Sequence, residues 1–205
     1  MIDLIQTVKR LRANQGVSDE RFDMVYPDPI HRLSTAHWTP VRVARRAAEL
    51  LVTKPGTKVL DVGSGSGKFC IIGALPTEGV FTGIEQRDYL VELSRSLAQR
   101  FLIERAHFIH GNMMGLDWSE YDSFYLYNPF VENMYDEASQ IDNDVAQTWF
   151  CYEKYVHTVR RKLLQAPAGT RVVTYHGFGG DFPPGYSCVL REPIGSDKLD
   201  VWVKD

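Results

Sequence analysis

The chain contains few cysteines, and their scarcity bears on which kinds of site it can hold. Only Cys70, Cys151 and Cys188 occur among 205 residues, and no two of them have the C-x-x-C spacing. An odd number of distant cysteines indicates neither a disulfide framework nor a zinc site. Histidines and acids also lack the spacing of metal ligands, so we predict no metal. We expect a reducing compartment for the protein, the cytoplasm.

Long apolar runs and an excess of one charge are missing as well. The longest apolar run, Phe69 to Leu75, is far shorter than the roughly 20 residues of a membrane-spanning helix, so we expect no membrane contact. The opening residues, MIDLIQTVKRLRAN, mix charged with apolar side chains and do not resemble a signal peptide. A net charge of −3 provides no long-range attraction to nucleic acid. With 44% hydrophobic residues the composition is that of an ordinary soluble globular protein, and we expect one domain.

A glycine-rich turn follows an apolar strand in the segment Val59 to Phe69, VLDVGSGSGKF. A strand, a glycine turn and a helix start together form a place where backbone can contact a nucleotide-like ligand. A phosphate-binding P-loop is excluded, because Phe69 follows Lys68 where Ser or Thr is required. A dinucleotide fingerprint is weakened, because its third glycine would fall on Lys68. An ordinary strand-to-helix turn stays open as an alternative.

An acid, Asp61, stands two residues before this G-x-G-x-G pattern, which resembles the first motif of the class I S-adenosylmethionine-dependent methyltransferases. The next predicted strand, Val80 to Glu85, ends in an acid, and a carboxylate there can accept hydrogen bonds from both ribose hydroxyls. A third strand, Ala106 to Asn112, ends in HGNMM, similar to the Gly-Asp-Ala turn of the family. The resemblance implies that the Asn112 side chain and the Met113 backbone reach the adenine edge.

The fourth predicted strand, Ser123 to Phe130, ends in Asn128 and Pro129. Methyltransferases of amino groups have Asn or Asp, two prolines and an aromatic residue at this place, and the chain resembles them with one proline missing. The resemblance implies that the Asn128 oxygen and a backbone carbonyl accept protons from a nitrogen nucleophile. An aromatic face at Phe130 would hold the planar group of that nucleophile, although Phe130 is explained equally well as a core residue.

Helix and strand periods alternate along the chain, as in a doubly wound α/β domain. We predict helices over Ile2 to Asn14, Thr39 to Val52 and Leu90 to Phe101, and a proline-marked loop at Tyr26 to Pro29. The longest apolar stripe is expected to pack against the sheet, and it comprises Val145, Trp149, Tyr152, Val156, Val159 and Leu163.

The last fifty residues predict three more strands. These are Thr170 to Tyr175 and a hairpin of Ser187 to Pro193 with Lys198 to Val203, joined by Gly195 and Ser196. The resemblance covers the chain from about Thr39 onward. It implies an α/β, Rossmann-like sheet of seven mostly parallel strands, with the last strand antiparallel, helices on both faces and a small N-terminal helical cap over residues 1–38.

Two histidines are candidates for moving a substrate proton. His37 precedes the helix start at Thr39, and His176 follows the fifth strand, at the edge where a ligand is expected. A structural role is the alternative for each. In this family orientation accounts for much of the rate, so a strong base is optional. The segment after His176, HGFGGDFPPG, replaces an expected helix and is either a substrate mouth or a rigid connector.

We therefore predict an enzyme, an S-adenosylmethionine-dependent methyltransferase whose acceptor is a nitrogen. A protein lysine or a small-molecule amine is favoured over nucleic acid. The alternatives are an NAD(P)-dependent oxidoreductase and a non-catalytic cofactor-binding module. The predicted catalytic residues are Tyr127, Asn128 and Phe130. The predicted cofactor-binding residues are Asp61, Gly63, Ser64, Gly65, Gly67, Glu85, Gln86, Asn112, Met113 and Asn128.

Overall fold

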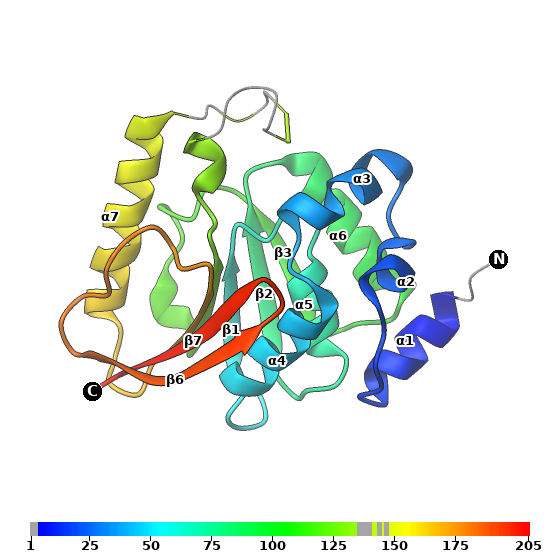
Figure 1. Ribbon diagram of the computed structural model, residues 1–205, viewed down its shortest axis with the longest axis horizontal. Helices are drawn as coiled ribbons and strands as arrows, with labels where there is room; N and C mark the ends of the chain where they lie inside the picture. The colour runs from blue at the N-terminus through cyan, green and yellow to red at the C-terminus, as the bar shows by residue number, and fades with distance from the viewer. Residues whose placement is uncertain (1–3, 135–140, 143–144, 146–147) are drawn as a thin grey trace.

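A seven-stranded sheet forms the centre of the computed structural model, which describes residues 4–134, 141–142, 145 and 148–205 (Figure 1). The strand order is β3-β2-β1-β4-β5-β7-β6. The strands are β1 (Lys58–Val62), β2 (Val80–Glu85), β3 (Ala106–His110), β4 (Ser123–Tyr127), β5 (Arg171–Tyr175), β6 (Tyr186–Ile194) and β7 (Asp197–Lys204). The first five strands are parallel, and β7 runs antiparallel to β5 and to β6. The predicted Rossmann-like fold is confirmed, including its antiparallel last strand.

Helices cover both faces of this sheet. They are α1 (Leu4–Arg12), α2 (Asp19–Asp23), α3 (Asp28–His37), α4 (Val41–Leu51), α5 (Lys68–Ala74), α6 (Asp88–Arg100) and α7 (Trp149–Gln165), with the 3-10 helices η1 (Trp118–Glu120) and η2 (Val131–Met134). Helices α4, α5 and α6 lie on one face with α1 to α3 beyond them, and α7 lies on the other (Figure 1). None of the helices in the described part of the chain is long and apolar enough to cross a membrane.

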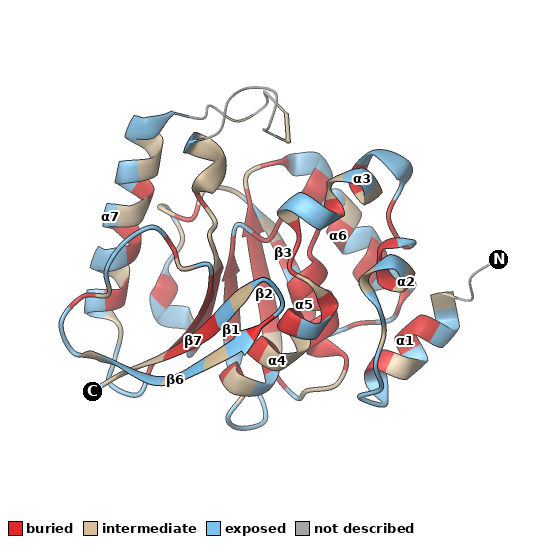
Figure 2. Ribbon diagram, in the orientation of Figure 1, coloured by how far each residue is buried: buried red, intermediate tan, exposed pale blue. Residues whose placement is uncertain are grey.

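Successive residues of a strand pack into two different apolar clusters, one on each face of the sheet. Val59 packs in the cluster that includes α4, α5 and α6, while Leu60 packs in the cluster that includes α7. Because side chains alternate along a strand, a sheet covered on both faces needs apolar residues at successive positions. Figure 2 shows the resulting buried strands between the helical layers.

The carboxyl ends of the five parallel strands meet at one edge of the sheet, and the glycine turn leaves β1 there. Gly63, Gly65 and Gly67 have φ angles of 75°, 52° and 74°, in the left-handed region that favours glycine. The backbone N–H groups of Gly63 and Ser64 both donate to the Ile84 carbonyl of β2, at 3.0 Å each. The turn is thereby fixed to the strand that ends in Glu85.

The N-terminal cap is more helical than the sequence predicted, and the expected loop at Tyr26 to Pro29 is confirmed only at Tyr26 and Pro27, because Asp28 and Pro29 already belong to α3. Helix α3 has Pro27 at its N-cap and Pro29 in its first turn, where the missing N–H of proline has no helical partner to lose. Only the start of the first predicted helix, at Ile2, lies outside the described residues. Val8, Leu11, Phe22 and Ile30 of the cap belong to the same apolar cluster as α4 and α5, so the cap packs on the core.

The predicted apolar stripe of α7 is wrong at its first two residues, Val145 and Trp149, whereas Tyr152 and Val156 are partly buried against the cluster of this face. The helix begins at Trp149, which is 56% exposed, and Val145 precedes it. The buried residues are Tyr155, Thr158, Val159 and Leu163. A helix of 17 residues is about 25 Å long, whereas a strand of five residues spans about 17 Å, so the first turns extend past the sheet. Tyr155, absent from the predicted stripe, is therefore the first residue of α7 that is buried.

Candidate functional site

A cavity of about 250 Å³ lies at the carboxyl edge of the parallel strands. Its lining comes from the end of α3, the glycine turn, the residues after β2 and β3, the segment from Tyr127 to Asn133, and α7. Eight predicted site residues line it, namely Gly63, Gly65, Glu85, Gln86, Met113, Tyr127, Asn128 and Phe130. The other four, Asp61, Ser64, Gly67 and Asn112, lie behind the lining.

Glu85 ends β2 with its carboxylate fixed by three backbone donors. One oxygen accepts the N–H groups of Gln86 and Arg87 at 2.8 and 3.0 Å, and the other accepts the Gly65 N–H at 3.1 Å. Burial raises the pKa of Glu85, while these N–H groups and the Arg87 charge act in the opposite direction. The carboxylate therefore joins the glycine turn to β2 at the cavity lining.

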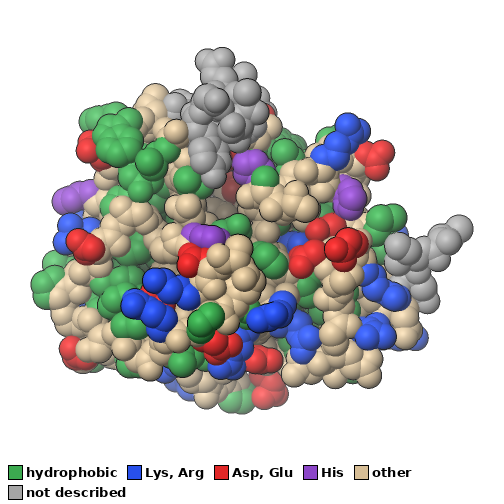
Figure 3. All heavy atoms as spheres, in the orientation of Figure 1, with side chains coloured by type: hydrophobic (Ala, Val, Ile, Leu, Met, Phe, Trp, Pro, Cys, Tyr) green, Lys and Arg blue, Asp and Glu red, His purple; other side chains and the backbone are tan. Residues whose placement is uncertain are grey.

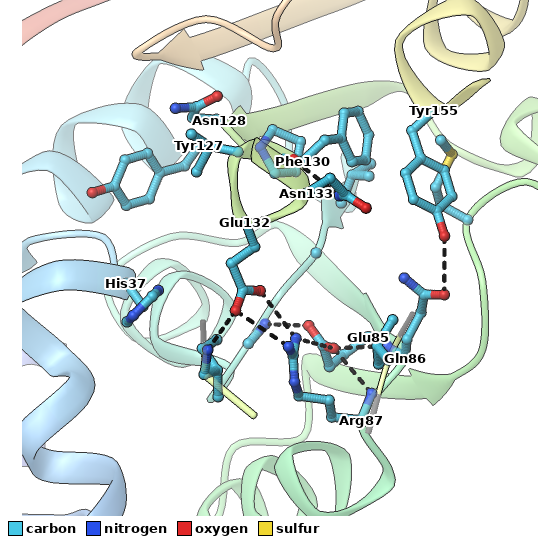
Figure 4. Close-up of a pocket in the computed structure, with 18 of the residues that line it drawn as sticks. His37, Glu85, Gln86, Arg87, Tyr127, Asn128, Phe130, Glu132, Asn133 and Tyr155 are labelled. Carbon is cyan, nitrogen blue, oxygen red and sulfur yellow. Dashed lines mark hydrogen bonds and ion pairs between the residues drawn. The ribbon is translucent and has the colours of Figure 1, made fainter. Parts of the chain in front are cut away.

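Arg87 crosses the cavity from β2 to the segment after β4, and the sequence did not predict it. Its guanidinium is 5% exposed and lies 3.2 Å from Glu132, 3.0 Å from Asp142 and 3.8 Å from Glu85. Figure 4 shows Arg87 between Glu85 and Glu132. A buried arginine needs such partners, because an unpaired charge out of water is costly. The ion pairs hold η2 over the cavity.

The Asn112 side chain forms hydrogen bonds with residues that line the cavity, without lining it itself. Its amide donates to Gln86 Oε1 at 2.7 Å and to the Tyr155 hydroxyl at 3.0 Å, and its oxygen accepts the Met114 N–H at 3.0 Å. These bonds use both N–H donors of the amide, while its oxygen keeps a second lone pair, so the adenine contact of the Asn112 side chain stays a prediction. Met113 lines the cavity, and its backbone contact with adenine likewise stays a prediction.

Asp61, Ser64 and Gly67 shape the turn without reaching the cavity. Asp61 is buried and accepts the Cys70 thiol at 3.5 Å, and burial raises its pKa to about 7. A Cβ added at Gly67 would lie 2.6 Å from Ser94 Oγ, so helix α6 packs directly on the turn. Ser64 packs against Gly83 of β2 in the same way. The close packing of α6 and β2 therefore explains why the turn consists of small residues. Asp61 is the buried acid that precedes it.

The segment after β4 places an amide and aromatic rings at the cavity. Asn128 has a φ of 38°, and its backbone N–H donates to the Gly177 carbonyl at 2.9 Å. Phe130 lines the cavity, is 5% exposed and stacks on Tyr155 with ring centroids 5.2 Å apart. Phe130 is therefore a core residue whose ring also lines the cavity, and its role as an aromatic platform stays a prediction.

The end of the cap lies over the glycine turn. His37 and Trp38 both line the cavity, and the indole N–H of Trp38 donates to the Ile30 carbonyl at 3.4 Å. A Cβ added at Gly65 would overlap the Trp38 ring, so this glycine is required by packing as well as by its φ. Burial lowers the pKa of His37, which favours its neutral form.

A buried lysine anchors the cap at the start of α5. Lys68 Nζ lies 2.7 Å from Asp19 of α2 and 2.7 Å from Asp23, and its side chain is 3% exposed. Asp23 in turn accepts the Ser34 hydroxyl of α3. Lys68, which follows the glycine turn, thus fixes two helices of the cap beside the cavity.

The central part of the chain matches a known protein family. Residues 53–161 match the model of a family described as a methyltransferase domain. The match covers more than half of the chain, which therefore belongs to this methyltransferase family. The predicted class, a class I methyltransferase that uses S-adenosylmethionine, is confirmed, and the NAD(P)-dependent oxidoreductase is set aside. No curated protein matches the chain significantly.

Solved structures of other proteins share the fold. An RNA methyltransferase from Salinibacter ruber, in complex with S-adenosyl-L-homocysteine, has a TM-score of 0.59 and 22% identity over 81% of this chain and 92% of its own. TrmN from Thermus thermophilus has a TM-score of 0.63 and 19% identity over 85% of this chain and 52% of its own, so the chain spans about half of TrmN. A mutant of MtNAS, in complex with S-adenosylmethionine, has a TM-score of 0.58 and 14% identity over 98% of this chain and 77% of its own.

Proposed function

We propose that the chain transfers the methyl group of S-adenosylmethionine to a nitrogen, in a protein lysine or a small-molecule amine. The observation that carries this proposal is the contact between the glycine turn and the Asn128-Pro129-Phe130 segment. A Cβ added at Gly63 would lie 3.2 Å from the Pro129 Cβ, and both segments line one cavity. The cofactor motif and the acceptor motif are therefore adjacent, as an in-line transfer requires.

The cavity lining fits the cofactor in the order that the motifs imply. Gly63 and Gly65 would lie along its amino-acid part, Glu85 at the ribose and Met113 at the adenine. A carboxylate has about four lone-pair sites, and Glu85 has given three to backbone N–H groups, so it still accepts a ribose hydroxyl. The bound cofactor would supply a methyl group already activated by the sulfonium charge.

Charge and ring chemistry favour a cationic acceptor over a polyanion. Glu85 and Glu132 face Arg87 at the cavity, which leaves an excess of negative charge among these three. Aromatic faces next to carboxylates attract ammonium groups, and Tyr127 and Phe130 supply such faces. On the face drawn in Figure 3, basic and acidic side chains are interspersed, whereas nucleic-acid binding proteins gather basic ones.

Two measurements test the proposal. Calorimetry with S-adenosylhomocysteine should give at least a tenfold weaker affinity in Glu85→Gln, because about 1.4 kcal/mol or more is lost with a charged hydroxyl acceptor. The exposed Glu153→Gln is the matched control and should bind like the wild type. Incubation with methyl-labelled cofactor and a cell lysate should then label protein or small amines. Label confined to the RNA fraction would contradict the nitrogen acceptors proposed here.

We also propose that residues 1–205 form one methyltransferase domain, in which residues 1–38 are a cap on a core of residues 39–205. The shared apolar cluster and the Lys68 ion pairs support this organisation. Because the cap contributes His37 and Trp38 to the cavity, the site would be incomplete without it.

A further inference from the structure

A pair of titratable side chains lies at the cavity beyond the predicted site. His176 follows β5 and lines the cavity, and its Nδ1 lies 2.8 Å from Asp197 Oδ2. Asp197 is the first residue of β7, so the pair joins the two strands that meet at this edge. The two side chains are about one third exposed, so the pair is open to solvent, and His176 is the member that lines the cavity.

The turn that carries Asp197 is fixed by a buried tyrosine. Tyr175 is 1% exposed, and its hydroxyl accepts the Ser196 N–H at 3.1 Å and lies 3.0 Å from Ser196 Oγ. Gly195 has a φ of 63°, and a Cβ there would lie 2.8 Å from the Tyr175 hydroxyl. The position of Asp197 is therefore set by the hairpin and by Tyr175, not by the His176 contact alone.

Backbone strain concentrates at the same place. His176 and Asn128 have φ angles of 57° and 38°, although neither is glycine. The Asn128 N–H bond to Gly177 ties the two strained ends together, and the Tyr127 ring lies 5.6 Å from the His176 ring. Residues held in this region cost free energy and cluster at active sites. The His176 ring thereby lies beside Tyr127, the residue that directly precedes the acceptor motif after β4.

We propose that His176 is the proton acceptor in the methyl-transfer reaction and that Asp197 is its positioning residue. This inference rests on the proposed function, because it takes the methyl acceptor to arrive as an ammonium group. Asp197 accepts the Nδ1 proton of His176 and so selects the tautomer with a lone pair on Nε2. No described residue forms a hydrogen bond with this Nε2, so it stays available to a substrate.

Protons and electrons balance in this step. Nε2 of His176 takes a proton from the ammonium group and leaves a neutral amine. The amine lone pair forms a bond to the methyl carbon, the carbon–sulfur bond breaks, and its electron pair stays on sulfur. The new methylammonium carries the positive charge that the sulfonium lost, and His176 releases its proton to solvent. The Asp197 carboxylate stabilises the transient imidazolium.

Substitutions at His176 can preserve its backbone. Asn and Gly both tolerate a positive φ, and Asn also keeps an N–H donor for Asp197. We expect His176→Asn to lower the rate of label transfer at least a hundredfold, while the affinity for S-adenosylhomocysteine changes less than about twofold. His157→Asn, at an exposed position of α7, is the control and should keep the wild-type rate. Added imidazole should restore activity to His176→Gly, because the missing ring leaves room for it.

Asp197→Asn tests the positioning role. We expect kcat to fall about tenfold or more with KM unchanged, and Asp197→Glu to recover part of the loss, because the carboxylate orients the ring. Wild-type rates in both His176 variants, or a loss in His176→Gly that imidazole does not restore, would overturn the proposal. Label in RNA would contradict the proposed acceptor class instead, and imidazole rescue measured on that same fraction would still support the His176 assignment.

Discussion

Asp61 and Glu85, the two acids that the sequence places around the glycine turn, have different surroundings. Glu85 receives three backbone N–H groups, whereas the one hydrogen bond recorded for Asp61 among the described residues comes from the weakly donating Cys70 thiol. Burial therefore dominates for Asp61 and raises its pKa to about 7, with the nearby Glu85 charge adding to the effect. The sequence motif alone could not separate these two environments.

Asp61 should make the stability of the protein depend on pH. Its pKa is higher in the folded state than in the unfolded chain, so its stabilising contribution is present below about pH 4 and is lost as the pH rises through about 7. Asp61→Asn removes this titration. We expect the free energy of unfolding of the variant, relative to wild type, to rise by up to about 4 kcal/mol between about pH 4 and pH 8.

Urea unfolding at several pH values measures this difference. Asp181→Asn, at an exposed position, is the control and should follow the wild type. Parallel curves for Asp61→Asn and wild type across the whole range would mean that folding does not raise the pKa of Asp61, contrary to the expectation.

Gly65 should tolerate no side chain, for two separable reasons. Its φ is 52°, and an added Cβ would overlap Trp38. Gly169 has a φ of 83° with nothing within 4 Å of an added Cβ, so Gly169→Ala measures the backbone cost alone, about 1 kcal/mol. We expect Gly65→Ala to lose at least 1 kcal/mol more in chemical denaturation. Equal losses in the two variants would show that Trp38 moves away without cost.

At the scale of elements, the strand ends were predictable and the contacts between them were not. Asp61, Glu85 and Asn128 each follow an apolar run, and parallel strands bring their carboxyl ends to one edge. Arg87 and Glu132 come shortly after two of these ends, but only their pairing across the cavity makes them part of the site. That pairing joins residues 45 positions apart, and no local pattern reports it.

The sequence signals for helices misplaced the starts of two elements, α3 and the buried part of α7. The prolines at 27 and 29 were taken for a loop, although proline is also suited to a helix start, as in α3. In α7 the apolar spacing was real, but it continued past the edge of the sheet to Trp149. How much of a helix is buried depends on the length of the strands that it covers. The apolar spacing of the helix carries no information about that length.

Lys68 should be the main link between α5 and the cap. Lys68→Met leaves Asp19 and Asp23 without their buried cation, and breaking such a pair costs about 3–5 kcal/mol. We expect a loss of that size in the free energy of unfolding. Lys58→Met, at an exposed position of β1, should change it little. The double variant Lys68→Met/Asp23→Asn should recover part of the loss, because the unpaired carboxylate is then gone.

At the scale of the whole molecule, the cap of residues 1–38 can be either a mobile lid or a fixed wall of the cavity. The sequence could place Trp38 before the helix start at Thr39, but not the ion pairs that hold the cap. In the structure Trp38 is 6% exposed, packs on Gly65 and belongs to the apolar cluster of α4 and α5. These contacts favour the wall, and we expect cap and core to unfold as one cooperative unit.

This cooperativity can be measured with single-tryptophan variants. Trp38 reports on the cap and Trp202, in β7, reports on the core, so each is kept in turn while the other three tryptophans become Phe. We expect the two fluorescence transitions in urea to coincide with each other and with the loss of helical circular dichroism, because one apolar cluster spans both parts. Saturating S-adenosylhomocysteine should raise both midpoints equally, since a ligand that binds only the folded unit stabilises all of it. A Trp38 transition at lower urea than the Trp202 transition would instead make the cap a separately unfolding lid, and the ligand would then act on the two midpoints unequally.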